Sequence, residues 1–129
     1  IVKHENLINS IKKNFQVDID KILKLNPFKR GKSGRIIKLG IDYYDTKDQE
    51  HTLIIDSEYN IRNILSESFL FSSAFTVNEQ DGNFILNGKG WGHGVGLCQI
   101  GALSMALANK KAEEILSHYY PRTNLKTIY

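Results

Sequence analysis

The residues best suited to chemistry lie in one glycine-rich stretch, residues 88–102, with the sequence GKGWGHGVGLCQIGA. Five of the chain's ten glycines alternate with other residues from Gly88 to Gly96. Glycine tolerates positive φ and lets other atoms approach the backbone, so this alternation predicts a loop of unusual geometry or close contact with a ligand. Because Trp91 and His93 lie between these glycines, the loop is the first candidate for a functional site.

A helical pattern follows the loop, with apolar residues spaced for one helix face from Val95 to about Ala108. The loop therefore leads into a helix N-terminus, whose unpaired N–H groups suit an anion, a polarised carbonyl or a sugar hydroxyl. Nucleotide-binding motifs do not fit. The glycines from Gly88 onward do not match G-x-G-x-x-G, and Asn26 stands where a phosphate loop ending at Lys32 and Ser33 needs its first glycine.

The stretch over residues 88–102, an alanine-rich helix and the ending EEILSHYYP over residues 113–121 together resemble one known family. This is the family of stage II sporulation protein D and the amidase enhancer LytB. The resemblance implies peptidoglycan glycan strands as the ligand, a location outside the cytoplasm, and lytic transglycosylase activity in the sporulation proteins. The alternative that it implies is a non-catalytic module that binds glycan or a partner wall amidase. Cys98 and Ile100 depart from the serine or threonine and the aromatic residue of many members.

The family's catalytic glutamate lies in an upstream E-M-P-type motif, and this sequence contains no such motif. The resemblance therefore implies that the general acid lies outside this chain and that the chain alone is inactive. Glu67 is the best internal substitute, because the apolar run Phe69–Phe71 would raise its pKa toward that of a working acid. The alternative is a solvent-facing side chain near a helix end.

Several residues of the loop and the chain end have two readings each. His93 could hydrogen-bond substrate and assist proton transfer, or lock the loop. Trp91 could offer its flat face to a sugar, or fill the core beneath the loop. Gln99 could recognise a sugar amide, or be buried for structural hydrogen bonds. The remaining substrate-binding candidates are the loop glycines and the two tyrosines of the chain end: Gly90, Gly92, Gly94, Gly96, Tyr119 and Tyr120. The alternative for the two tyrosines is packing against the sheet.

Cys98 raises a rival class of function, a Cys-His nucleophile acting on an acyl or peptide bond. It also falls on the apolar face of the expected helix, where a buried thiol would be inert. His93 and Cys98 are five residues apart, and no pair has the spacing of metal ligands. We therefore expect neither a metal nor a cofactor.

The composition fits a single domain of 129 residues with an ordinary apolar content. A net charge of +3, without a basic stripe and interleaved aromatics, does not indicate nucleic-acid binding. No apolar run is long enough to span a membrane. The chain opens at Ile1 without a signal peptide, so we expect an export signal or anchor outside it.

Periodicity predicts an α+β fold: a small mixed or barrel-like sheet with inserted helices, and a glycine-rich loop leading into a central helix. A helical lead-in over residues 1–30 precedes the sheet and signature helix over residues 31–129, with a basic turn over residues 29–34 that is a solvated connection or a contact to anionic glycan. The predicted helices are 5–15, 18–25, 57–65, 95–108 and 112–119, and the predicted strands are 35–42, 51–56, 72–77, 83–87 and 125–129.

Overall fold

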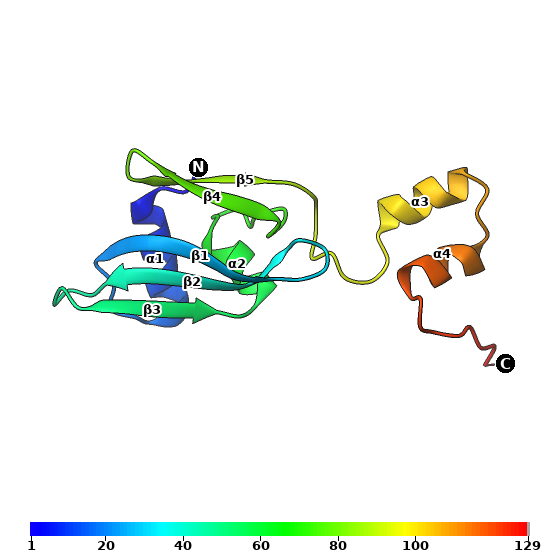
Figure 1. Ribbon diagram of the computed structural model, residues 1–129, viewed down its shortest axis with the longest axis horizontal. Helices are drawn as coiled ribbons and strands as arrows, with labels where there is room; N and C mark the ends of the chain where they lie inside the picture. The colour runs from blue at the N-terminus through cyan, green and yellow to red at the C-terminus, as the bar shows by residue number, and fades with distance from the viewer. Residues whose placement is uncertain (129) are drawn as a thin grey trace. The chain divides into compact units, whose positions relative to one another are not determined.

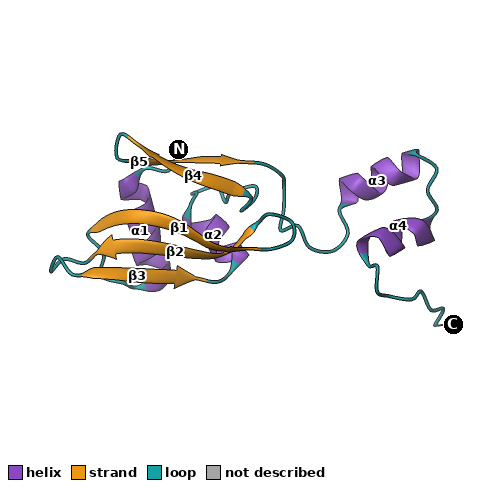
Figure 2. Ribbon diagram, in the orientation of Figure 1, coloured by secondary structure: helices purple, strands orange, loops and turns teal. Residues whose placement is uncertain are grey.

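The computed structural model describes residues 1–128 and divides into two compact units, Ile1–His93 and Gly94–Tyr129. The strands all lie in the first unit, and the second unit contains a pair of helices (Figures 1 and 2). The predicted α+β class is confirmed. The strands of residues 1–128 form a three-stranded and a two-stranded antiparallel sheet, which do not close into a barrel.

The three-stranded sheet consists of β1 (Lys21–Arg30), β2 (Ile36–Tyr44) and β3 (Glu50–Ile55), with β2 in the middle. β2 and β3, predicted as strands over 35–42 and 51–56, pair antiparallel as a hairpin. On β2, Leu39 and Ile41 point into the core, as period-two alternation requires.

The helix predicted over Asp18–Leu25 is wrong, and the lead-in over residues 1–30 is helical only in its first half, because β1 occupies the rest. Ile22 and Leu25 are both buried although they lie three residues apart. A register shift between Ile22 and Lys24 explains this, since an extra residue lets both side chains face the same side of the strand. Apolar residues at this spacing look like a helix face in a sequence.

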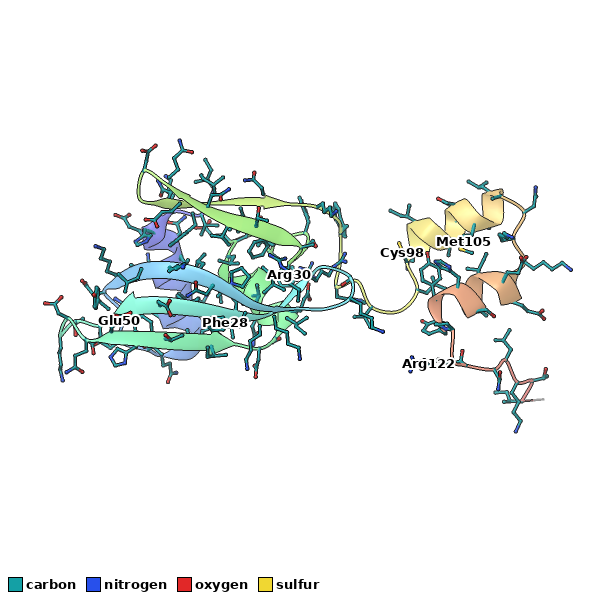
Figure 3. The ribbon with its side chains drawn as sticks, in the orientation of Figure 1. Phe28, Arg30, Glu50, Cys98, Met105 and Arg122 are labelled. Atoms are coloured by element: carbon teal, nitrogen blue, oxygen red, sulfur yellow. The ribbon has the colours of Figure 1, made fainter. Side chains whose placement is uncertain are left out.

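Pro27 lies inside β1 and does not end the strand. Its missing N–H is tolerated because β1 is an edge strand, and the register shifts again between Pro27 and Lys29. Arg30, labelled in Figure 3, lies at the end of β1 and donates a hydrogen bond of 2.7 Å to the carbonyl of Phe75. This bond connects the two sheets of the first unit.

Helices α1 (His4–Phe15) and α2 (Glu58–Ile64) confirm two of the predicted helices. Leu7 and Ile11 are the buried residues of α1. The Ser57 hydroxyl accepts a hydrogen bond of 3.3 Å from the Asn60 N–H, so Ser57 is the N-cap of α2. Both helices lie on one side of the three-stranded sheet (Figure 1).

The two-stranded sheet pairs β4 (Phe75–Gln80) with β5 (Asn83–Gly88), so the predicted strand over 72–77 begins three residues later than expected. Val2 forms an isolated bridge with Phe84, which attaches the N-terminal residues to β5. The core of this unit contains the following buried side chains: Val2, Leu7, Ile11, Ile19, Ile22, Leu25, Ile36, Leu39, Ile41, Tyr43, Ile55, Ile61, Ile64, Leu65, Phe75 and Phe84.

The second unit consists of α3 (Gln99–Leu107) and α4 (Ala112–Tyr119), which contact each other. Both helices are predicted from the sequence, but α3 begins at Gln99 instead of Val95. A β-carbon at Gly101 would overlap the Tyr119 hydroxyl group, so glycine allows this ring to pack against α3.

The strand predicted over 125–129 is not found in the described residues, because residues 125–128 are irregular and Tyr129 lies outside the described part of the chain. At the start of α4, the Glu114 carboxylate accepts the Lys111 N–H at 2.9 Å and pairs with Lys110 at 3.1 Å. These contacts, the Lys111 N–H first, hold the pKa of Glu114 below its usual range. Glu114 therefore helps to cap the N-terminus of α4.

Within residues 1–128, none of the helices has the length and apolar character needed to cross a bilayer. The same residues contain no group of three or more His, Cys, Asp or Glu side chains arranged to hold a metal ion.

The turn between β2 and β3 should make the stability of the first unit sensitive to acid. The Gln49 N–H, then the His51 ring at 2.9 Å and the Lys47 N–H, hold the pKa of Asp45 below its usual range. A lowered folded-state pKa means that the stabilisation is present above the unfolded pKa of about 3.9 and is lost as the pH falls through the folded value. Urea unfolding at several pH values should therefore show Asp45→Asn less stable than wild type at pH 6, with the difference shrinking below about pH 4. A difference that stays constant to pH 2 would contradict this account.

Candidate functional site

The glycine-rich loop has the left-handed geometry that its sequence predicts. Gly90, Gly92, Gly94 and Gly96 have φ values of +84°, +79°, +69° and +73°. Residues with a side chain rarely adopt these values, so every second position of the loop requires glycine. The loop crosses the boundary between the two units, with Gly90 to His93 in the first and Gly94 onward in the second.

Arg35, just before β2, holds the first half of the loop. Its Nε donates to the carbonyl of Gly92 at 2.7 Å, and its Nη2 donates to the carbonyl of Trp91 at 3.2 Å. The Gly92 N–H in turn donates to the carbonyl of Phe71 at 2.7 Å. A β-carbon at Gly90 would lie 3.2 Å from the Arg35 guanidinium. Arg35 therefore fixes the backbone from which the Trp91 side chain projects.

Trp91 lies at the surface and stacks on Phe71. Their ring centroids are 4.5 Å apart with an interplanar angle of 20°. The side chains are 76% and 64% exposed, so the alternative in which Trp91 fills the core is wrong. We call this pair the aromatic platform. It offers a flat apolar surface whose orientation is set by ring stacking and by the backbone contacts of the loop.

His93 is the last residue of the first unit and is exposed. Glu67 lies elsewhere in the same unit. It accepts a hydrogen bond of 3.2 Å from Asn6 and lines a groove beside α1, to whose lining neither Trp91 nor His93 contributes. Because the Glu67 side chain is exposed, the apolar enclosure expected for a catalytic acid is missing.

In the second unit, Cys98 is the N-cap of α3 (Figure 3), and its Sγ accepts the Gly101 N–H at 3.4 Å. The thiol is exposed and not buried on an apolar helix face. Gln99 is exposed, contrary to the alternative of structural burial.

The two tyrosines of the chain end lie near glycines of the same unit. A β-carbon on Gly96 would lie 3.4 Å from the Tyr120 hydroxyl, and Tyr119 packs at Gly101. The structure thus associates Tyr120 with the second half of the loop.

Two residues of the site are missing from the sequence-based prediction. The sequence predicts Phe71 only as part of an apolar run and Arg35 only as the first residue of a strand. Their contacts with Trp91 join residues 20 and 56 positions apart, and no local pattern encodes such pairings. The sequence contains one indication of the role of Arg35. This arginine ends a turn with two glycines and has no acidic residue near it in the sequence.

Residues 2–96 match a domain family described as a domain of unknown function, DUF8618. The chain belongs to this family. The DUF8618 match covers β1 to β5 and most of the glycine loop.

Three curated proteins are also similar to the chain. An uncharacterized protein of Brachyspira hyodysenteriae is 38% identical over 69% of this chain and 22% of its own length. The amidase enhancer of Bacillus subtilis is 35% identical over 50% of this chain and 9% of its own length, and stage II sporulation protein D of Bacillus amyloliquefaciens is 39% identical over 46% and 17%. These matches confirm the resemblance to the sporulation protein D and amidase enhancer family. The chain spans less than a quarter of each relative's length.

Replacement of Arg35 by methionine should loosen the aromatic platform. The change removes two charge-assisted hydrogen bonds to the loop backbone, so Trp91 should gain mobility, and its fluorescence anisotropy should fall. Arg30→Met is the matched control, because Arg30 also donates to two backbone carbonyls but does not touch the loop. An equal loss of Trp91 anisotropy in both variants would show that Arg35 has no specific role.

Proposed function

We propose that the chain is a peptidoglycan-binding module of the cell envelope, and that its aromatic platform binds the glycan strand. The observation that supports this most is the stacked, exposed pair of Trp91 and Phe71 on a loop of left-handed glycines. Flat aromatic surfaces suit the apolar C–H faces of sugar rings, while nearby backbone groups suit their hydroxyl and acetamido groups. Likeness to an amidase enhancer and to a sporulation protein supports a wall-related ligand and an extracytoplasmic location.

His93, two residues after Trp91, is proposed to hydrogen-bond the bound sugar or assist proton transfer. Gly90 and Gly92 bring the backbone close to the ligand. Within the second unit, Gly94, Gly96, Gln99, Tyr119 and Tyr120 are also proposed to bind glycan.

The whole protein is proposed to be a lytic transglycosylase. In that reaction the C6 hydroxyl of N-acetylmuramic acid attacks its own C1 as the C1–O bond breaks. An acid gives its proton to the leaving O4 of N-acetylglucosamine and takes up the hydroxyl proton. Because Glu67 is exposed and lines a groove to which the aromatic platform does not contribute, we assign the acid to a residue outside this chain. The chain's role is to hold the strand in place.

The second candidate is a non-catalytic module that binds glycan or a wall amidase and enhances it, and the name of the Bacillus subtilis relative favours it. A digest of purified peptidoglycan separates the two. The whole protein should release 1,6-anhydro sugar ends if it is a transglycosylase, and none if it is an enhancer. Release by this chain alone would contradict the external acid, and Glu67→Gln would then be the variant to measure.

Binding itself is tested by co-sedimentation of the chain with insoluble peptidoglycan. The chain should sediment with saturation, and a soluble N-acetylglucosamine tetramer should compete it off. Sedimentation that the tetramer does not reduce would contradict the proposed glycan site.

A further inference from the structure

A second candidate site lies between α1 and the segment that leaves α2. Two adjoining hollows of about 380 and 350 Å³ share the residues Asn6, Ser10, Ser66 and Glu67. We call them together the α1 groove. Neither residues of the loop nor those of the aromatic platform line it, so it is a separate feature of the first unit.

One wall of the groove is a stripe of α1 together with Lys3, the N-cap residue directly before it. Lys3, Asn6, Ser10 and Lys13 follow one another at intervals of three or four residues, which places them on one face of a helix. With a rise of about 1.5 Å per residue, Lys3 and Lys13 lie about 15 Å apart along the axis. Glu67, on the opposite wall, lines both hollows. The charges along the groove therefore run positive, negative, positive.

The rest of the lining combines an apolar floor with short polar side chains. Leu7, Ile64 and Leu65 are buried and contribute the floor. Ile1 and Val2 add apolar surface at one end of the groove. Most of the other lining residues carry amide or hydroxyl groups: Asn6, Asn9, Ser10, Asn14, Asn63, Ser66 and Ser68. Asparagine offers both donors and acceptors, so such a surface suits a ligand with alternating N–H and C=O groups.

The chemistry of the groove differs from that of the aromatic platform. No aromatic ring is among its lining residues, so it lacks the flat surface that favours a sugar ring. An extended peptide rises about 3.3 Å per residue, and four or five residues match a span of about 15 Å. The two lysines suit carboxylates near the ends of such a peptide, and Glu67 suits an amine between them.

We propose that the α1 groove binds a short extended peptide with carboxylates toward both ends and an amine near its centre, of the kind that cross-links glycan strands. This inference adds a second site to the proposed function and rests on it for the source of the peptide. Glu67 then acts as a binding residue, which accounts for its exposure and its contact with Asn6.

The test is an NMR titration of the isotope-labelled chain with the N-acetylated pentapeptide L-Ala-γ-D-Glu-L-Lys-D-Ala-D-Ala. Amide signals of Asn6, Ser10 and Glu67 should shift with saturation. Lys13→Met should raise the Kd about fivefold, the size expected for one exposed ion pair. Lys12→Met is the matched control, because it removes the same charge from the last turn of α1 at a residue that does not line the groove.

Three results would overturn the proposal: no saturable shift in the groove, equal weakening by Lys12→Met, or equal binding of the same peptide with both carboxylates amidated. The N-acetylglucosamine tetramer, titrated in parallel, should shift Trp91 and leave the groove unchanged. Loss of tetramer binding with the peptide site intact would contradict the glycan site alone. Loss of peptide binding with the tetramer site intact would contradict the groove alone.

Discussion

Replacement of Trp91 by alanine is expected to weaken binding of an N-acetylglucosamine tetramer by about tenfold or more, as measured by isothermal titration calorimetry. The reason is that Trp91 provides most of the exposed flat surface at the site, and alanine removes it while leaving Phe71 without its stacking partner. The fold should be unaffected, because the side chain is largely exposed and makes no contribution to the buried core.

Tyr59→Ala is the matched control for this change. Tyr59 is also exposed, at 63%, and its ring contacts Phe69 at 5.1 Å, so the variant loses a comparable surface aromatic pair away from the loop. Its tetramer affinity should equal that of the wild type. Wild-type affinity in Trp91→Ala, or equal losses in both variants, would exclude the aromatic platform as the binding surface.

Phe84→Ala is expected to lower the free energy of unfolding by about 3–5 kcal/mol, the usual cost of a cavity of this size in a core. Phe84 is 1% exposed, stacks on His4 at 5.1 Å and forms the bridge to Val2, so it joins the N-terminal residues to the smaller sheet. Urea unfolding followed by circular dichroism measures the change.

The control for Phe84→Ala is Phe71→Ala, which makes the same truncation at a side chain that is 64% exposed. It should cost less than about 1 kcal/mol, since little apolar surface is lost from the core. Similar losses in the two variants would contradict the position of the core.

The elements with unbroken local patterns are those that the sequence predicts correctly. The helix at the N-terminus and α4 have apolar residues at helical spacing, and Leu39, Ile41 and Tyr43 of β2 alternate with less buried residues in strand spacing, apart from Gly40. β1 is missed because the register shift between Ile22 and Lys24 converts a strand pattern into one that resembles a helix face. Pairing with β2 determines that this segment is a strand, and pairing partners are remote in sequence.

In the candidate site, too, local features are predictable from the sequence and long-range contacts are not. The left-handed glycines follow from residue type alone, since alternating glycines have few other structural uses. The side on which Trp91 lies depends on Phe71 and Arg35, which meet it only in the folded chain. The exposure of Glu67 likewise depends on α1, whose Asn6 faces it across the groove.

Trp91 is the chain's single tryptophan, so its fluorescence reports on the proposed glycan site without interference. Titration of the intact chain with the N-acetylglucosamine tetramer measures the central claim most directly. A saturable change in emission, with the same midpoint as the calorimetric Kd, is the result that we predict. Emission that stays unchanged at tetramer concentrations that saturate binding by calorimetry would place the sugar elsewhere and contradict the account.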